Sequence, residues 1–165
     1  MINLIVIFNC MDSKNIIRHL IRELAREIDL RQEYESAGVV CLKKIDNIWH
    51  VLSLRKHNGN YDITKGLIDD EDATPLDAAK REAREEANIT DMEFLWGDVS
   101  KSYGKGITFI CQTSQEPEIL PNPESGDFEH ESAAWLTFDD LIQKLTGTKT
   151  EYLVPAIEWA RIISQ

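Results

Sequence analysis

The chain has 165 residues, with 18 lysines and arginines against 29 aspartates and glutamates and a formal net charge of −11. The length suits one domain, and a content of 42% apolar and 28% charged residues argues against an intrinsically disordered chain. The acidic balance disfavours a general binder of nucleic acid or of anionic membranes, because both partners are polyanions.

The cysteines and the N-terminal residues give no sign of secretion. Cys10, Cys41 and Cys111 are widely spaced and form no Cys-x-x-Cys pair, which indicates reduced thiols rather than a zinc knuckle or a redox dithiol. Residues 1–8 are apolar, but they lack a basic flank and are too short for a membrane helix. We therefore expect a cytoplasmic protein without a membrane partner.

Two elements are predicted before residue 34. Residues 2–9 are rich in β-branched apolar side chains and predict a short strand. A helix then runs from Asp12 or Ser13 to about residue 32, with an apolar stripe at helical spacing. Its intermixed arginines and glutamates favour packing on the core or on a partner over a membrane-surface helix. We expect residues 1–33 to form a strand–helix extension packed on a domain of residues 34–165.

The rest of the chain alternates strands and helices. Residues 36–44 and 48–56 predict two strands joined by a tight turn. Thr74 and Pro75 give a strong helix start, and Asn88 can take the left-handed conformation that ends this helix. Further expected elements are strands at 92–100, 106–114 and 128–137, an acidic, proline-rich loop at 116–127, and helices at 138–146 and 150–163. This order predicts one α/β domain.

Three carboxylates gather on one face of the helix that follows Thr74. Glu82, Glu85 and Glu86 stand at positions i, i+3 and i+4, so their mutual repulsion costs helix stability unless a cation neutralises it. Magnesium is suited to this task, because it takes oxygen ligands and bridges to substrate phosphates. The alternative is a solvated acidic face with Arg81 and Arg84 as ordinary ion-pair partners.

This stretch resembles the Nudix box, G-x5-E-x7-R-E-U-x-E-E-x-G-U, where U is a bulky aliphatic residue. Arg81, Glu82, Glu85, Glu86 and Ile89 fall in register with it. SAGVV resembles the opening strand of Nudix domains, YDITKG resembles their W-x-x-P-K-G run, and EHESAAWL resembles the E-H-x-x-x-x-W-L strand of diadenosine tetraphosphate hydrolases. The resemblance covers about residues 34–163 and implies the Nudix fold, an α/β/α sandwich around a mixed β-sheet.

The box also departs from the family pattern. The segment from Gly66 to Arg81 is one residue longer than the family spacing, so the first glutamate of the box falls on Ala73. A bulge in the loop could bring Asp72 into that role. Asn88 replaces the last glycine of the box, which is a mild change because asparagine tolerates the left-handed conformation.

The resemblance implies a magnesium-dependent pyrophosphohydrolase, with manganese as a substitute metal. Glu82, Glu85 and Glu86 are then the metal ligands, and the main-chain carbonyl of Gly66 or of Lys65 completes the metal shell. Arg81 orients the glutamates, and we count it among the catalytic residues together with Glu85.

Other residues are candidates for the remaining roles. Glu129 is the candidate base or additional metal ligand, and its alternative is a plain acid at a loop end. His130 either aligns the substrate or caps its strand. By the resemblance the Lys65 side chain could meet a phosphate. Arg55 could contact a phosphate too, although such a residue is more often a solvated charge at a strand end. Tyr103 or Tyr152 could stack on a base, but ordinary packing explains either one equally well.

Several substrates and one further class of function stay open. The KG and EH…WL segments favour a dinucleoside polyphosphate that is cleaved to a nucleoside triphosphate and a monophosphate. ADP-ribose or another nucleoside diphosphate derivative comes next. The altered box loop could instead mark a nucleotide-binding regulator with weak catalysis, whose N-terminal helix contacts a partner or a second copy in a homodimer.

Overall fold

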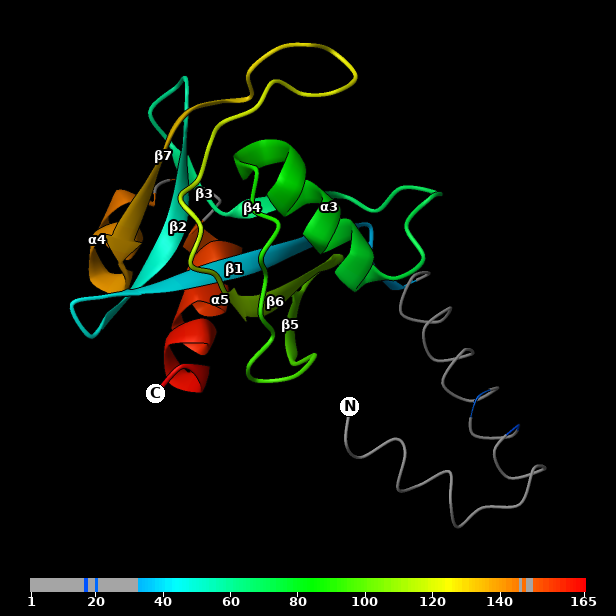
Figure 1. The fold of residues 1–165 in the computed structure, drawn as a ribbon, viewed down its shortest axis with the longest axis horizontal. Coiled ribbons are helices and arrows are strands. Elements are labelled where there is room, and N and C mark those ends of the chain that lie inside the picture. Colours follow the sequence, from blue (N-terminus) through cyan, green and yellow to red (C-terminus); the bar gives the residue numbers. More distant parts are fainter. Residues whose placement is uncertain (1–16, 18–19, 21–32, 146, 148–149) are drawn as a thin grey trace.

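The computed structural model describes residues 33–145, 147 and 150–165, together with residues 17 and 20 (Figure 1). The strand expected at 2–9 and Cys10 lie outside the described residues. Of the expected helix 12–32, only Ile17 and Leu20 are described, and they are helical and exposed to 55% and 52%. The packing of the extension therefore stays a prediction.

A seven-stranded mixed sheet forms the centre of the described domain. Its middle strand, β1 (Ser36–Ile45), runs antiparallel to β2 (Ile48–Lys56) and parallel to β6 (Gly106–Gln112). These strands consist largely of β-branched, aliphatic and aromatic residues, which suit a sheet covered on both faces. The other strands are β3 (Tyr61–Asp62), β4 (Thr64–Leu67), β5 (Ser100–Tyr103) and β7 (His130–Thr137).

The sheet divides along one side of β1. Residues 36–39 of β1 pair with β4, whereas residues 42–45 pair with β2. Farther along, β2 pairs with β3 on one side and with β7 on the other. Only Ile63 separates β3 from β4, so the chain crosses at this residue from a neighbour of β2 to a neighbour of β1. We call this place the fork of the sheet, and Lys65 and Gly66 follow it directly on β4.

Helices cover both faces of the sheet (Figure 1). Helix α3 (Pro75–Ala87) lies on one face, where its alanines pack against the alternate residues of β1, β2 and β6. Helices α4 (Phe138–Lys144) and α5 (Thr150–Ile163) lie on the opposite face and bury Val40, Leu42 and Ile110. This arrangement confirms the predicted α/β/α sandwich around a mixed sheet.

Local chemistry explains where α3 begins and ends. The side chain of Thr74 accepts a hydrogen bond of 3.1 Å from the backbone N–H of Asp77, and Pro75 fills the first turn. At the other end Asn88 has φ 53°, the left-handed conformation predicted for it. The tight turn between β1 and β2 likewise has positive φ at Asp46 and Asn47.

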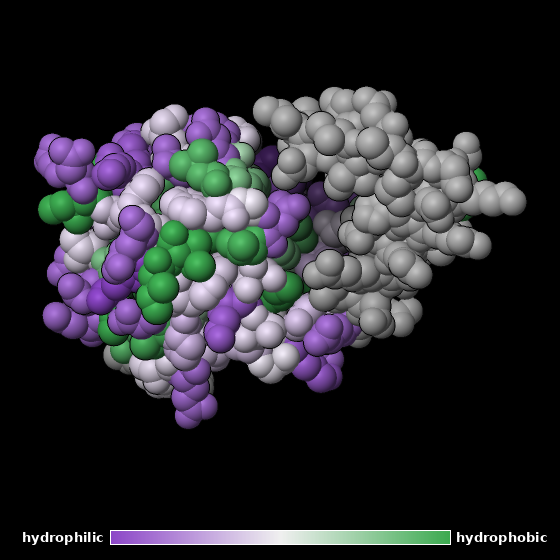
Figure 2. Space-filling view, turned by 90° about the horizontal axis from the view of Figure 1, so that it is seen from below, coloured by the Kyte–Doolittle hydropathy of each residue, from purple (hydrophilic) through white to green (hydrophobic). Residues whose placement is uncertain are grey.

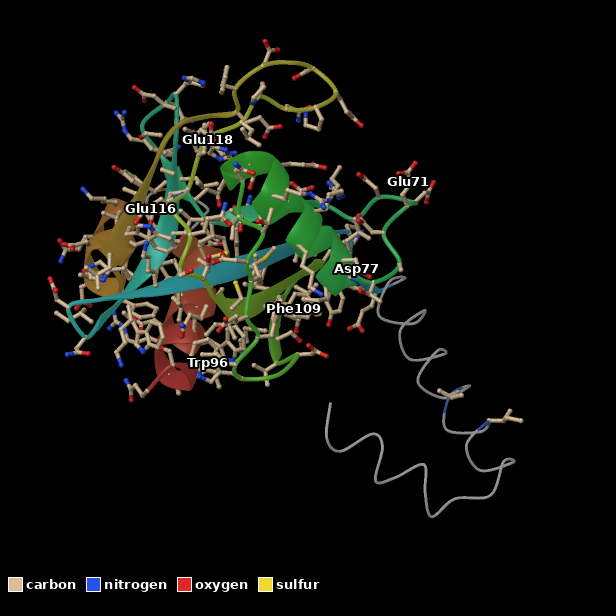
Figure 3. All side chains as sticks on the ribbon, viewed as in Figure 1. Glu71, Asp77, Trp96, Phe109, Glu116 and Glu118 are labelled. Atoms are coloured by element: carbon tan, nitrogen blue, oxygen red, sulfur yellow. The ribbon has the colours of Figure 1, made fainter. Side chains whose placement is uncertain are left out.

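The strand predicted at 92–100 is wrong. Within this segment Glu93 makes an isolated bridge to Gln112, and the nearby strand β5 begins only at Ser100. The chain turns at Gly97, whose φ is 75°. Trp96, labelled in Figure 3, packs edge-on against Trp49 with ring centroids 5.8 Å apart. Met92, Phe94 and Trp96 therefore pack against the core from a loop.

The surface of the described domain mixes polar and apolar side chains. Figure 2 shows small apolar patches separated by hydrophilic ones. Within the described ranges, no helix combines the length and the apolar character that crossing a membrane requires. The large apolar side chains exposed on the folded domain, from Tyr34 onward, are Ile48, Leu67, Leu95, Val99, Phe128 and Ile162.

Candidate functional site

Arg81 is the centre of an ion-pair network on α3. Its Nε and Nη2 donate to the two carboxylate oxygens of Asp72 at 3.1 and 2.9 Å. Its Nη1 donates to Glu82 at 2.7 Å and to Glu85 at 3.1 Å, and Nη2 also reaches the carbonyl of Leu67 at 2.8 Å. One guanidinium thereby fixes two of the three facing glutamates and ties the helix to the preceding loop.

The loop before α3 brings Asp72 to Arg81. Asp72 is only 6% exposed, and one of its carboxylate oxygens accepts from the backbone N–H of Asp69 at 2.8 Å. The N–H of Asp72 in turn donates to the carbonyl of Asp69 at 3.1 Å, which closes a turn. Ala73 and Glu71 are exposed, and Figure 3 shows Glu71 on the outer part of this loop. Asp72 is thus the buried loop acid that pairs with Arg81, whereas the exposed Asp69 lies 3.2 Å from the same guanidinium.

Gly66 leaves room for the carboxylate of Glu82. A Cβ built on Gly66 would lie 2.3 Å from Cδ and Oε1 of Glu82 and 2.4 Å from Oε2. Any other residue at position 66 would therefore displace this carboxylate. Burial raises the pKa of Glu82, and this effect outweighs the opposing hydrogen bond from Arg81.

Glu86 is the most buried of the three glutamates on α3. Its side chain is 11% exposed, and its Oε2 accepts a 3.0 Å hydrogen bond from the backbone N–H of Lys65. Burial, reinforced by the charge of Glu82, raises the pKa of Glu86 to about 8. A buried carboxylate of this kind binds either a proton or a nearby cation at neutral pH.

Glu129 and His130 join these glutamates from β7 and the loop before it. Glu129 lines the same cavity as Glu82 and Glu85, and its carboxylate accepts a 2.6 Å hydrogen bond from Asn122. We call this space, of about 330 Å³, the carboxylate cavity. An inner extension of about 20 Å³, lined by Glu86 and His130 as well, has room for a water molecule.

His130 is buried and incompletely satisfied. It is 2% exposed, its Nδ1 lies 3.7 Å from Glu86, and its Nε2 has no hydrogen-bond partner among the described residues. Burial, with a smaller contribution from the charge of Lys56, lowers the pKa of His130 to about 4. The imidazole is therefore neutral at neutral pH, with one ring nitrogen still able to meet a ligand or a water molecule.

A larger cavity of about 650 Å³ adjoins the carboxylate cavity and shares Lys65, Gly66 and Leu67 with it. Tyr103 and Tyr152 line it with stacked rings, whose centroids are 5.4 Å apart. We call this space the tyrosine cavity. Its remaining lining residues are Glu35, Ser36, Gly104, Lys105, Gly106 and Glu151.

Two neighbours fix the ring of Tyr103. Its hydroxyl accepts a 3.0 Å hydrogen bond from Thr108 on β6. A Cβ built on Gly106 would lie 2.4 Å from the ring, so the glycine lets the tyrosine pack closely over the strand end. The Lys105 ammonium and the Glu35 carboxylate form an ion pair at the mouth of the cavity.

Lys65 lies between the two cavities and lines both. Its ammonium is 3.1 Å from Oδ2 of Asp62, a carboxylate that is 1% exposed. Burial acts to lower the pKa of Lys65, but the charge and hydrogen bond of Asp62 outweigh it, so the pKa is raised. Tyr152 and Glu86 contribute to this rise, which places the lysine in the electrostatic field of both cavities.

The structure brings most of the predicted site residues together. Arg55 is the exception: it lies on β2, pairs with Glu131 and lines neither of the two cavities. Two contributors were missed from the sequence, Asp62 and Asn122. A short strand that carries an aspartate three residues before a lysine is a signal for the first, whereas nothing in the loop sequence singles out the second.

The donor set fits a hard divalent cation. The candidate ligands are carboxylate oxygens and the main-chain carbonyl of Gly66 or Lys65, all oxygen donors of the kind that magnesium prefers, and Gly66 also leaves the space that Glu82 fills. Within the described ranges, no three acidic, histidine or cysteine side chains already converge as a finished ligand set. Arg81 instead holds Glu82 and Glu85, so a cation would draw on the oxygens that face the cavity.

The comparisons with known proteins agree with this geometry. The family model of the NUDIX domain matches residues 34–157. No curated protein matches the chain in sequence. Among solved structures, an Ap4A hydrolase of C. elegans in a binary complex is similar with a TM-score of 0.60 and 17% identity, over 79% of this chain and 98% of that one.

Two further solved structures share the fold. The NUDIX domain of Shewanella oneidensis NrtR, crystallised with ADP ribose, has a TM-score of 0.54 and 17% identity, over 79% of this chain and 88% of that one. The E. coli dihydroneopterin triphosphate pyrophosphohydrolase has a TM-score of 0.53 and 19% identity, over 78% of this chain and 97% of that one. At these identities the likeness concerns the fold alone.

Proposed function

The chain belongs to the NUDIX domain family, and from this premise we propose that it hydrolyses a pyrophosphate linkage in a nucleoside diphosphate joined to another group. One observation carries the proposal: the carboxylate cavity and the tyrosine cavity share the wall formed by Lys65 and Gly66. A nucleotide has an aromatic end and an anionic end, so it can fill both spaces at once. The family match supports the assignment to the pyrophosphohydrolases.

Glu82, Glu85 and Glu86 would hold the magnesium ion, and Arg81, which lines the same cavity, would orient Glu82 and Glu85 through its hydrogen bonds. Bound magnesium supplies positive charge that screens the phosphates and polarises the phosphorus–oxygen bonds. The binding of a cation also relieves the repulsion between Glu82 and Glu86, two largely buried neighbouring carboxylates.

Glu129 is the proposed general base. It lines the carboxylate cavity opposite α3, and its hydrogen bond from Asn122 holds it there. It would take a proton from the attacking water while the new phosphorus–oxygen bond forms and the anhydride oxygen leaves with the other phosphate. Lys65 would meet a phosphate between the two cavities, and a base would stack on the tyrosine pair.

The first substrate to test is a dinucleoside polyphosphate such as diadenosine tetraphosphate, as the KG and EH…WL segments suggest. Hydrolysis with magnesium or manganese, followed by chromatography, should give ATP and AMP. Glu86→Gln should lower kcat by at least about 100-fold, because it removes a metal ligand. Glu71→Gln, an acid on the exposed loop before α3, is the matched control and should retain activity.

ADP-ribose is the second candidate, because it presents one adenosine and one diphosphate to the same two cavities. The values of kcat/KM for the two substrates, measured on the same protein, show which one is preferred. Absence of turnover with either one, and with nucleoside triphosphates and dinucleotide coenzymes under both metals, would overturn the enzyme proposal and leave a nucleotide-binding regulator.

A further inference from the structure

The ammonium of Lys65 lies beside the carboxylate of Asp62 at the fork of the sheet. Asp62 belongs to β3, a neighbour of β2, whereas Lys65 belongs to β4, a neighbour of β1. Their contact of 3.1 Å therefore links the two branches of the fork. Asp62 is 1% exposed, and its Oδ1 accepts a 3.0 Å hydrogen bond from the N–H of Ile63, so its position is fixed by the fold.

Lys65 has a second anionic neighbour. Its backbone N–H bonds to Glu86, and its flexible side chain starts from the same residue. Without a competing partner, the ammonium could turn toward the carboxylate of Glu86 and form an ion pair there. The ammonium would then neutralise the Glu86 carboxylate, whose negative charge a divalent cation needs.

We propose that Asp62 is a positioning residue: its carboxylate holds the Lys65 ammonium at the boundary of the two cavities and away from Glu86. The inference deepens the proposed function and rests on it. Asp62 touches neither the carboxylate cavity nor the tyrosine cavity itself, since only Lys65 of this pair lines them. Its effect is to separate the cation that contacts phosphate from the carboxylates that bind metal.

Lys56 provides a matched control for charge. Its ammonium lies 3.7 Å from the same oxygen of Asp62, yet it lines neither cavity. Lys56→Gln therefore removes one positive charge next to Asp62 without touching the boundary that Lys65 occupies. If Asp62 acts only through the overall charge around it, Lys56→Gln should change Mn²⁺ binding and KM. If Asp62 acts by holding Lys65, Lys56→Gln should change neither.

The test compares Asp62→Asn, Lys65→Gln, the double variant, Lys56→Gln and the conservative Asp62→Glu. The first readout is Mn²⁺ binding to the full-length protein without substrate, followed by electron paramagnetic resonance. We expect Asp62→Asn to weaken Mn²⁺ binding about tenfold, because the released ammonium competes at Glu86. Lys65→Gln and the double variant should bind Mn²⁺ like the wild type, because the competing ammonium is gone.

The second readout is the separation of KM from kcat with diadenosine tetraphosphate and ADP-ribose. Lys65→Gln should raise KM about tenfold, which corresponds to the loss of one charge-assisted contact. Asp62→Asn should raise KM at saturating metal, and Asp62→Glu should restore part of the loss. Lys56→Gln should stay within about twofold of the wild type, and thermal unfolding shows which variants remain folded.

Two results would overturn the inference while the proposed function stands. One is an Asp62→Asn variant that binds Mn²⁺ and substrate as the wild type does. The other is a double variant as weak in Mn²⁺ binding as Asp62→Asn, which would mean that the buried asparagine distorts the fold. If the wild type neither binds Mn²⁺ nor hydrolyses any nucleotide, the proposed function itself fails, and the inference with it.

Discussion

Asp72 and Arg81 meet with two parallel hydrogen bonds, from Nε to one carboxylate oxygen at 3.1 Å and from Nη2 to the other at 2.9 Å. The same guanidinium bonds Glu82 and Glu85, so the loop acid orients two candidate metal ligands through the arginine. Asp72→Asn should lower kcat about 10–100-fold with little change in KM, as expected when a residue behind the ligands is lost.

The same substitution should reduce the free energy of unfolding by on the order of 1–3 kcal/mol, because a buried charged hydrogen bond is broken. Steady-state kinetics and urea unfolding measure the two effects. Glu71→Gln changes the charge equally on an exposed part of the loop and should alter neither quantity. An Asp72→Asn enzyme with the kcat of the wild type would show that Arg81 needs no help from the loop.

Gly66→Ala tests the space beside Glu82. The new methyl group would lie 2.3 Å from the carboxylate, so Glu82 must move. We expect Mg²⁺ binding, measured by calorimetry, to weaken about 10–100-fold. Gly59→Ala adds a methyl group with no neighbour within 4 Å and costs stability only through its φ of 81°. Unchanged metal affinity in Gly66→Ala would argue against Glu82 as a ligand.

Tyr152→Leu tests the tyrosine cavity. Loss of a stacking ring should raise KM for a nucleotide substrate by about 5–30-fold, which corresponds to about 1–2 kcal/mol. The KM for inorganic triphosphate should not change, because that molecule has no aromatic group. Kinetics with the two substrates on the same protein make this comparison internal. An equal rise for both would mean that Tyr152 supports the fold rather than a base.

Glu86 should make stability depend on pH in the metal-free protein. Burial and the charge of Glu82 raise its pKa to about 8 from 4.5, so between these values the folded state binds a proton that the unfolded chain has lost. The free energy of unfolding should therefore fall as pH rises from 6.5 to 8. His130, whose pKa is lowered to about 4, is neutral in both states over most of this window.

Urea unfolding at several pH values in the presence of a chelator measures this slope, and Glu86→Gln should flatten it. Mg²⁺ must replace the proton on Glu86, so its apparent affinity should increase with pH up to about 8 and then level off. A wild-type slope that equals that of Glu86→Gln would refute the buried carboxylate as its source.

Local signals made much of the fold predictable. The cap at Thr74, the proline after it and the left-handed Asn88 are short-range features, and α3 begins and ends where they predict. The prediction of a strand at 92–100 was wrong because the chain turns at Gly97 and Trp96 makes a long-range contact with Trp49. A pattern of apolar residues does not show whether a strand or a loop buries them.

The candidate site was likewise predictable only where local spacing brings its residues together. Glu82, Glu85 and Glu86 share a helix face, so their proximity follows from spacing alone. The sequence left open whether Asp72 could take the place of the first box glutamate, which falls on Ala73, and the turn from Asp69 brings Asp72 to Arg81. The role proposed for Asp62 depends also on the pairing of β3 with β2, which the local spacing of the aspartate and the lysine does not show.

The hydrogen bond from the Lys65 amide to Glu86 gives the protein a built-in spectroscopic probe. A proton or a metal ion on that carboxylate must change the strength of the bond, and with it the amide chemical shift of Lys65. One resonance in a nitrogen–proton correlation spectrum would then report the fraction of molecules with a proton or a metal ion on Glu86, independently of turnover. A protein that has bound metal but does not turn over substrate could thus be distinguished from the metal-free protein.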